Sequence, residues 1–228
     1  LFAISGEAEI LTIRKNVDRE IKDAARSIRE QTERIKLIVA KLMEFSRAAG
    51  EAFSAIDINQ AIQKVYGLLK YQIKLGNVIV NFKMDDNIPK TFGNYNQLQE
   101  VFLNIMLNSV QSMGEKGQLT VRTFRETAAK PYAGFGRVEI KKGDELVVAE
   151  FKDTGKGMDT ETLNKIFNPF FSTKEKGTGL GLAIVYKIIE NHEGVILVDS
   201  KPGEGTIFTV KLPVFKGGKN VQKDSSDR

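Results

Sequence analysis

Three oxygen-bearing side chains, Glu100, Asn104 and Asn108, are spaced four residues apart in a segment of helical periodicity. Residues four apart lie on one face of an α-helix, so the carboxylate and the two carboxamides form a single polar row. Oxygen donors of this kind suit a Mg²⁺ ion that keeps several waters and bridges phosphates. A hydrogen-bonded network without a metal explains the row slightly better when the row is considered alone.

An aspartate, Asp153, stands at the end of an apolar segment in "FKDTGKGMD", where Gly155 and Gly157 follow it. A carboxylate in this position can accept a hydrogen bond from an exocyclic amine such as that of adenine. The glycines let a flat ring approach the backbone. An ordinary Asp–Gly turn is the alternative, because such turns are common. The segment by itself indicates a base-binding site only weakly.

Alternate glycines, Gly177, Gly179 and Gly181, stand at the start of a helix expected over residues 179–191. Their spacing matches neither the dinucleotide-binding fingerprint nor the P-loop. Glycines at a helix start nevertheless leave backbone N–H groups open to an anion, and the helix dipole and Lys174 add positive potential. A helix start selected only for tight packing is the alternative.

The composition excludes several classes of protein. Cysteine is absent from the 228 residues, which rules out disulfides and thiolate metal sites. The net charge of +5 comes from basic residues interleaved with acids, so we predict no nucleic-acid binding and favour an anionic ligand or an acidic partner. No apolar run approaches the roughly 20 residues that cross a bilayer. We therefore expect a cytoplasmic fragment, with any membrane attachment in segments upstream of it.

Apolar residues recur at intervals of seven near the start of the chain, at Ile21, Ile28, Ile35 and Leu42. This heptad pattern, with charged residues on the remaining faces, predicts a helical hairpin made of residues 1–14 and about 18–47. A lone hairpin leaves its apolar stripe uncovered, so we expect residues 1–50 to form a homodimeric four-helix bundle. A helix packed on the downstream domain of the same chain is the alternative.

Residues 51–215 mix helical and strand patterns, which predicts an α+β domain with helices on one face of a mixed sheet. We expect helices at 58–74, 94–113 and 179–191. We expect strands at 77–84, 118–124, 194–200 and 205–213, and a hairpin over 137–153 that turns at Gly143. The polar residues 216–228 are expected to be disordered.

Five short segments follow one another in a specific order: "QLQEVFLNIMLNSVQSM", "DTGKGM", "IFNPFFSTK", "GTGLGLAI" and "GEGT". They resemble the N box, the first glycine box, the F box and the second and third glycine boxes of the sensor histidine kinases of two-component systems. The resemblance implies an α/β-sandwich ATP-binding domain of the kind shared with gyrase, MutL and the ninety-kilodalton heat-shock chaperone. The short segment between the F box and the second glycine box resembles the nitrogen-regulation type.

The resemblance implies ATP and Mg²⁺ as cofactors, and it assigns roles by position. Asp153 would bind the adenine amine and Asn108 would coordinate Mg²⁺, while Glu100, Asn104 and Lys174 would take part in catalysis. The nucleotide-binding residues that it implies are Asn104, Asn108, Asp153, Gly155, Gly157, Phe167, Lys174, Gly177, Thr178, Gly179, Leu180, Gly181 and Thr206.

The reaction implied by the resemblance is transfer of the γ-phosphate of ATP to a histidine, and then to an aspartate of a response-regulator receiver domain. The resemblance also implies that such a core can support dephosphorylation of the receiver domain. Residues 167–176 would form the mobile lid over the bound ATP. The stretch "LFAISGEAEIL" resembles the one after the H box, so the phosphoacceptor would lie six positions before Leu1. We interpret His192, the single histidine of the chain, as a helix C-terminal residue beside the Gly194 cap.

Three alternatives share these nucleotide boxes. A degenerate scaffold would bind ATP without turnover, and the intact glycine boxes argue against it. A conformational ATPase of the gyrase or MutL kind uses a glutamate as general base where this chain has Asn104, so we expect slow hydrolysis. A serine kinase of the anti-sigma type is disfavoured by the N-terminal hairpin.

Overall fold

A computed structural model describes residues 2–14, 18–29, 31–32, 52–75, 77–114, 116–133, 139–174 and 177–217. The chain divides into two compact units, one of Leu1–Glu51 with Ile166–Ile184 and one of Ala52–Lys165 with Val185–Arg228. Residues 33–47 of the expected hairpin and 218–228 of the expected disordered tail lie outside the described residues. The expected domain boundary near residue 50 stays a prediction.

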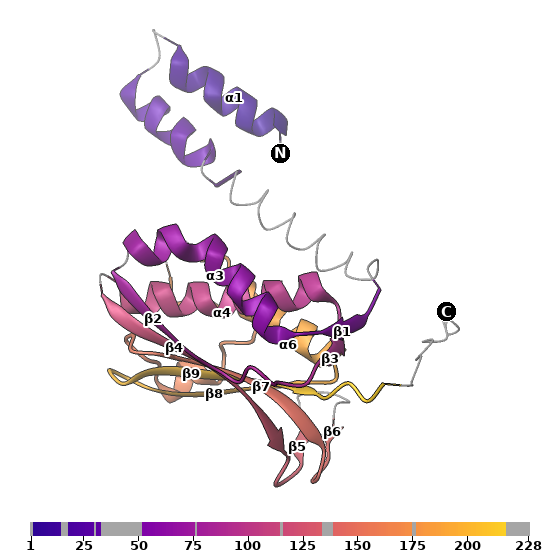
Figure 1. The fold of residues 1–228 in the computed structure, drawn as a ribbon. Coiled ribbons are helices and arrows are strands. Elements are labelled where there is room, and N and C mark those ends of the chain that lie inside the picture. Colours follow the sequence, from indigo (N-terminus) through magenta and orange to yellow (C-terminus); the bar gives the residue numbers. More distant parts are fainter. Residues whose placement is uncertain are drawn as a thin grey trace. The chain divides into compact units, whose positions relative to one another are not determined.

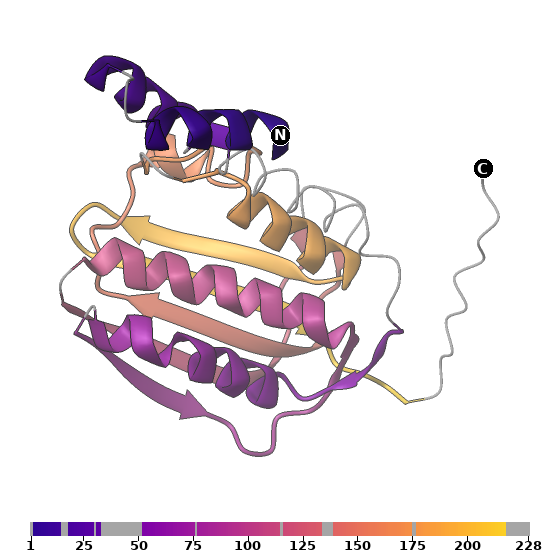
Figure 2. The ribbon, with the colours of Figure 1, turned by 90° about the horizontal axis from the view of Figure 1, so that it is seen from above.

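The first unit begins with two helices that lie side by side in Figures 1 and 2. The first is α1 (Phe2–Ile13), and the second includes residues 19–29. Two members of the heptad stripe, Ile21 and Ile28, are 51% and 48% exposed. Apolar side chains in a heptad row need a facing apolar surface, so the row is available to a partner helix. The stripe residues Ile35 and Leu42 lie outside the described residues.

A mixed five-stranded sheet forms the framework of the second unit, as expected. Its strands, in spatial order, are β2 (Val78–Met84), β4 (Gly117–Thr127), β7 (Glu145–Asp153), β9 (Gly205–Pro213) and β8 (Val195–Lys201). The β2–β4 pair is parallel and the other pairs are antiparallel. The register places Asp153, the last residue of β7, opposite Thr206 of β9.

Helices cover one face of this sheet (Figures 1 and 2). They are α3 (Ile58–Leu75), α4 (Tyr95–Met113) and α6 (Gly181–Asn191), and a short helix α5 (Thr160–Leu163) lies in a connection. The apolar face of α4 packs on the sheet, where the rings of Phe102 and Phe151 are 5.8 Å apart. Five apolar side chains of α4 are fully buried: Leu98, Val101, Phe102, Ile105 and Met106. None of the described helices is long and apolar enough to cross a membrane.

The expected hairpin over residues 137–153 is wrong in its pairing. The turn at Gly143 is present, with a φ of 94°. However, β6 (Glu139–Ile140) pairs with β5 (Tyr132–Ala133), whereas β7 pairs with β4 and β9. Both edges of β7 are occupied by longer ladders, so no edge is left for the residues before the turn.

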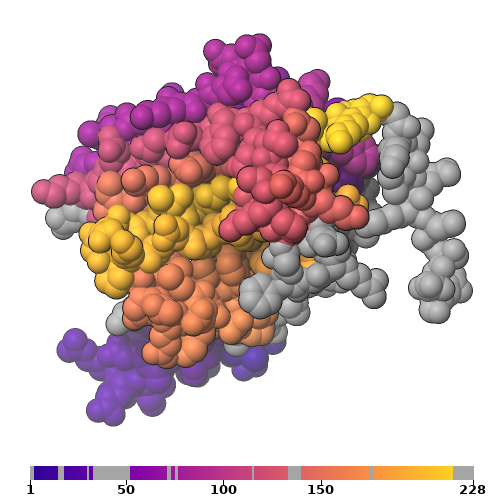
Figure 3. All heavy atoms as spheres, turned by 90° about the horizontal axis from the view of Figure 1, so that it is seen from below, coloured from indigo at the N-terminus to yellow at the C-terminus, as the bar shows by residue number. Residues whose placement is uncertain are grey.

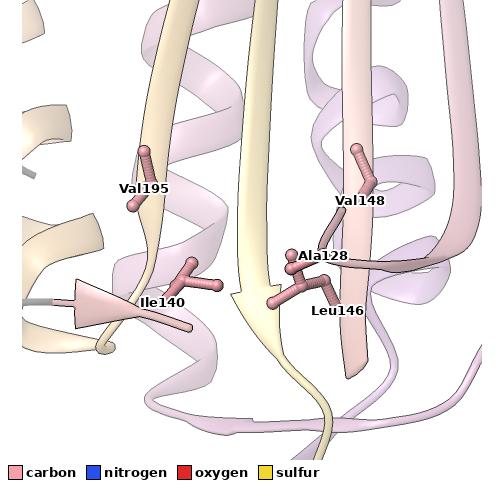
Figure 4. Close-up of a cluster of buried hydrophobic side chains, with 5 residues drawn as sticks. All are labelled: Ala128, Ile140, Leu146, Val148 and Val195. Atoms are coloured by element: carbon pink, nitrogen blue, oxygen red, sulfur yellow. The ribbon is translucent and has the colours of Figure 1, made fainter. Parts of the chain in front are cut away.

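A cluster of buried apolar residues contains Leu146 and Val148 of β7, and Figure 4 shows its five buried members. They are Ala128, Ile140, Leu146, Val148 and Val195. Figure 3 views the molecule from below, where β8 and β9, in yellow, are visible at the surface.

Lys211 of β9 lies opposite Val148 of β7 in the sheet. Its ammonium group donates to both carboxylate oxygens of Glu126, at 2.6 and 2.8 Å, and to the hydroxyl of Tyr132 at 2.9 Å.

A two-stranded sheet, which the sequence did not predict, joins β1 (Ser54–Ile56) to β3 (Thr91–Gly93). Phe92 of β3 packs against Phe53 and Phe215, with ring centroids 5.6 and 5.3 Å apart. The backbone N–H of Phe215 donates to the carbonyl of Lys90 at 2.7 Å. The segments that lead into and out of the second unit therefore both pack on Phe92.

Candidate functional site

The carboxylate of Asp153 lies at the C-terminal end of β7 and is 1% exposed. Its Oδ1 accepts hydrogen bonds from the backbone N–H of Gly155 at 2.9 Å, the N–H of Thr206 at 3.2 Å and the Ser112 hydroxyl at 3.2 Å. Burial raises the pKa of Asp153 above its ordinary value, and the neighbouring donors offset this only in part. A buried carboxylate of this kind is stabilised by a further donor, so the site favours a ligand that supplies one.

The loop after Asp153 is held against the turn before β9 by backbone contacts that need glycine. Gly157 has a φ of 67°, and a Cβ there would collide with the carbonyl oxygen of Lys201. Gly205 has a φ of 89°, and a Cβ there would collide with the carbonyl of Asp153. The N–H of Gly203 donates to the carbonyl of Lys156 at 2.7 Å. The structure thus brings together four residues that the sequence singled out: Asp153, Gly155, Gly157 and Thr206.

Two serines of α4 complete the surroundings of this carboxylate, and the sequence analysis missed both. The Ser112 hydroxyl has a single proton, which is shared between the carbonyl of Ser109 at 2.8 Å and Oδ1 of Asp153 at 3.2 Å. Ser109 is 0% exposed and lowers the pKa of Asp153, yet its Oγ forms no hydrogen bond of normal geometry with the described residues. Ser109 directly follows Asn108 and Ser112 lies one turn beyond it, but nothing in their residue type or spacing indicated this role.

The polar row expected on α4 is present, and Glu100, Asn104 and Asn108 are all half-buried. The amide nitrogen of Asn104 donates to the carbonyl of Glu100 at 2.9 Å. This bond uses one of the two N–H groups of the Asn104 amide and orients the side chain along its own helix. Its carbonyl oxygen is the group that can accept a hydrogen bond or bind a cation.

The glycine-rich segment that precedes α6 folds on itself. The N–H of Phe170 donates to the carbonyl of Gly179 at 3.0 Å. Both residues have left-handed backbones, with φ of 68° and 69°, and a Cβ on Gly179 would collide with the Phe170 backbone. The N–H of Gly177 donates to the carbonyl of Lys174 at 3.1 Å. The sequence-predicted residues Phe167, Lys174, Gly177, Thr178, Gly179, Leu180 and Gly181 all lie in this segment or at the start of α6.

Comparison with known proteins matches residues 93–216 to the family of histidine kinase-, DNA gyrase B-, and HSP90-like ATPases. The chain belongs to this ATPase family. The match extends from the last residue of β3, before the asparagine helix α4, to just beyond β9, and it includes the candidate site residues of α4, of the loop after β7, of the glycine-rich segment and of β9. The resemblance inferred from the five boxes is confirmed for the family, and the nitrogen-regulation type stays a prediction.

Relatives within this ATPase family include sensor kinases. The sensor histidine kinase ZraS of Klebsiella oxytoca is 34% identical over 97% of this chain and 45% of its own length. Sporulation kinase C of Bacillus subtilis is 33% identical over 94% of this chain and 46% of its own length. The chain thus spans less than half the length of these curated relatives. The solved catalytic domain of the histidine kinase ThkA is 26% identical with a TM-score of 0.58, covering 72% of this chain and 99% of that domain.

An ATPase of this family implies Mg²⁺, and the residues present fit that ion. The described residues hold no group of three or more His, Cys, Asp or Glu side chains that could form a metal site of their own. Mg²⁺ bound to a nucleotide needs only one or two protein ligands, because phosphates and waters provide the rest. The carbonyl oxygens of Asn108 and Asn104 can supply them.

His192 directly follows the C-terminal residue of α6 and is buried among groups of the protein itself. It is 3% exposed, its Nδ1 is 2.7 Å from the carbonyl oxygen of Ile188, and its ring is stacked on Phe53 at 4.9 Å. Burial lowers the pKa of His192. The left-handed cap residue is Glu193, with a φ of 56°, so the expected Gly194 cap is wrong by one position. Gly194 is needed for another reason, since a Cβ there would lie 2.6 Å from the carbonyl oxygen of Lys211.

Proposed function

We propose that this chain is the ATP-binding and catalytic part of a sensor histidine kinase of the nitrogen-regulation type. The observation that carries the proposal is the buried Asp153 carboxylate, with three donors on Oδ1 and a glycine loop packed beside it. Membership of the ATPase family and the kinase relatives support it.

Adenine recognition follows from the chemistry of this carboxylate. An ionised carboxylate only accepts hydrogen bonds, and the 6-amino group of adenine donates one. Guanine presents a carbonyl oxygen in the same place and would be repelled. Gly155, Gly157 and Thr206, which adjoin Asp153, would shape the space for the ring.

The phosphates would be bound by the remaining sequence-predicted residues. Asn108 would hold Mg²⁺, which neutralises charge on the transferred phosphoryl group when bound. Asn104 would contact the phosphates or a water. Lys174 would reach the terminal phosphates, and the backbone of Gly177, Thr178, Gly179, Leu180 and Gly181 would cradle them at the start of α6. The N–H of Gly177 is used by the carbonyl of Lys174, so the N–H groups offered to the phosphates would come from the residues after it.

The reaction would break the bond between the γ-phosphorus of ATP and its bridging oxygen, with ADP as the leaving group. A new bond would form between that phosphorus and a ring nitrogen of a histidine six positions before Leu1. An aspartate of a receiver domain would then accept the phosphoryl group, and the same core could support receiver dephosphorylation. Residues 1–50 would form the homodimeric bundle that presents the histidine, and residues 51–215 would form the catalytic domain.

Steady hydrolysis of ATP should be slow. An amide cannot take a proton from water, and the nitrogen of Asn104 is bound to the carbonyl of Glu100. This feature argues against a conformational ATPase, whose catalysis needs a carboxylate base at that position. Labelled inorganic phosphate released faster than labelled protein forms would contradict the kinase proposal.

Calorimetry with ATP tests the adenine assignment. Asp153→Asn places an amide nitrogen beside the adenine amine, so we expect the dissociation constant to rise by about 10- to 100-fold, as for loss of a charged hydrogen bond. Asp159→Asn is the matched control, because Asp159 is exposed and its cap of α5 needs only an acceptor. If both variants bind ATP with equal affinity, the assignment of Asp153 to the adenine site is contradicted.

Phosphorylation tests the reaction. The chain is extended upstream through the expected H box and incubated with ATP labelled in the γ-phosphate. We expect acid-labile, base-stable label on the upstream histidine, and none after that histidine is replaced. Label that remains on protein whose single histidine is His192 would overturn the assignment.

A further inference from the structure

The Ser109 hydroxyl is buried beside Asp153 with unused hydrogen-bonding capacity. Ser109 is 0% exposed, and its Oγ has no hydrogen-bond partner among the described residues. Its neighbour Ser112 shows the ordinary arrangement, since that hydroxyl donates to a carbonyl one turn back, at 2.8 Å. A buried hydroxyl without a partner destabilises a folded protein, so a ligand that completes its hydrogen bonding is a specific explanation for it.

The other donors around the carboxylate are already committed. The N–H groups of Gly155 and Thr206 and the hydroxyl of Ser112 all donate to Oδ1 of Asp153. The Ser109 hydroxyl also lowers the pKa of Asp153, but its Oγ forms no hydrogen bond of normal geometry with the described residues, so its proton can turn to a bound molecule. An adenine whose amine donates to Asp153 carries its ring nitrogen N1, an acceptor, directly beside that amine.

We propose that Ser109 is a specificity-determining residue whose hydroxyl donates to N1 of adenine, directly or through one water. This inference rests on the proposed adenine site and adds a second contact to it. Asp153 then accepts from the amine while Ser109 donates to the adjacent nitrogen. Guanine presents the opposite pair, a carbonyl oxygen and an N–H, and so fails at both contacts.

Two alanine variants of the 228-residue chain test the proposal. Ser109→Ala removes an unsatisfied hydroxyl, so the unfolding midpoint of the nucleotide-free protein should rise by about 2–4 °C while the dissociation constant for ATP rises about tenfold. Ser112→Ala removes a satisfied hydroxyl, so its midpoint should fall. A lower midpoint for Ser109→Ala, or unchanged ATP affinity, would overturn the proposal.

A nucleotide analogue identifies the contacted atom. In 1-deaza-ATP a C–H group replaces N1, so the wild-type protein should bind it about tenfold more weakly than ATP. Ser109→Ala should bind ATP and 1-deaza-ATP with equal affinity. An equal loss of both nucleotides on Ser109→Ala would show that the serine does not act through N1. Wild-type protein without affinity for ATP would defeat the proposed function itself, whereas ATP binding without a Ser109 effect defeats only this inference.

Discussion

The Nε2 atom of His192, at the end of α6, accepts a hydrogen bond from the backbone N–H of Asn94, 2.9 Å away at the start of α4. Its Nδ1 lies 2.7 Å from the carbonyl oxygen of Ile188 and therefore carries the proton. The neutral imidazole thus connects the ends of two helices that are 98 residues apart in the sequence. Protonation would place a hydrogen on Nε2 and remove the acceptor that Asn94 uses.

The free energy of unfolding should therefore depend on pH near neutrality. The pKa of His192 is lowered in the folded protein by burial, and no charged group is among the causes of this shift. Its stabilising contribution is complete above the unfolded value of about 6.5 and is lost as the pH falls through the folded pKa. His192 is the single histidine of the chain, so the difference in urea unfolding between the wild type and His192 variants over about pH 5 to 8 measures this residue.

Two substitutions separate the contacts of this ring. His192→Gln can place its carbonyl oxygen near the position of Nε2 and keep the acceptor for Asn94, so the pH dependence should disappear with most stability retained. His192→Asn can keep only the donor to Ile188, so the Asn94 N–H is left unsatisfied at a cost of about 1–3 kcal/mol. A pH dependence that persists in both variants would contradict the assignment to His192.

The affinity for adenosine should depend on the ionisation of Asp153. Burial raises the pKa of this carboxyl in the free protein, and binding of an amine favours its ionised form. Affinity should fall as the pH falls through the raised pKa, and binding near that pH should release protons. Calorimetry in buffers of different ionisation enthalpy measures the number of protons released on binding. Adenosine is used in place of ATP because it has no phosphates that titrate in the same pH range. Uptake of protons when adenosine binds would contradict the role assigned to Asp153.

Gly157 and Gly114 provide a matched pair of alanine substitutions. Their φ angles are 67° and 66°, but a Cβ on Gly114 meets nothing within 4 Å, whereas one on Gly157 collides with the Lys201 carbonyl. Gly114 has a ψ of −115°, a backbone conformation that favours glycine strongly, so Gly114→Ala should cost roughly 1–3 kcal/mol of stability for backbone strain alone. Gly157→Ala should cost roughly 1–3 kcal/mol more, because the loop and the turn must separate. Equal losses in urea unfolding would show that the loop moves freely.

Lys211 should contribute more to stability than an exposed ion pair on the same sheet. Burial alone would lower its pKa, but hydrogen bonds to Glu126 and Tyr132 outweigh burial and raise it. Lys211→Met should cost about 2 kcal/mol in urea unfolding, because the Glu126 carboxylate and the Tyr132 hydroxyl lose their partner. Arg122→Met removes a pair whose arginine is 49% exposed, so it should cost less than about 1 kcal/mol. The reverse order would contradict the role of Lys211.

The sequence predicted α4 well because its apolar pattern repeats over five turns and leaves one interpretation. It predicted β7 but not its partners, because strand pairing depends on which edges are free after the longer ladders have formed. The three-residue strands β1 and β3 are too short to show a period. Their pairing, between segments far apart in the sequence, became visible only in the structure.

The candidate site was predictable where residue type carries the chemistry. An aspartate followed by glycines at a strand end is a weak indication by itself, and it became informative through the order of the five boxes. The register places Asp153 opposite Thr206, two of the residues that those boxes indicated. Ser109 and Ser112 carried no such signal, because a serine on a helix acquires a role only when β7 ends opposite it. The contact of His192 with Asn94 was missed for the same reason, since nothing in either segment points to the other.

The packing of Phe53 and Phe215 on Phe92 has a mechanical consequence. The segment that leads into the second unit and the one that leads out of it contact the same ring, at 5.6 and 5.3 Å. A pulling force applied along the chain from both sides would therefore load this aromatic cluster and the short β1–β3 pair before it reached the five-stranded sheet. The cluster would yield first, and the ladder that ends at Asp153 would keep its register under the load.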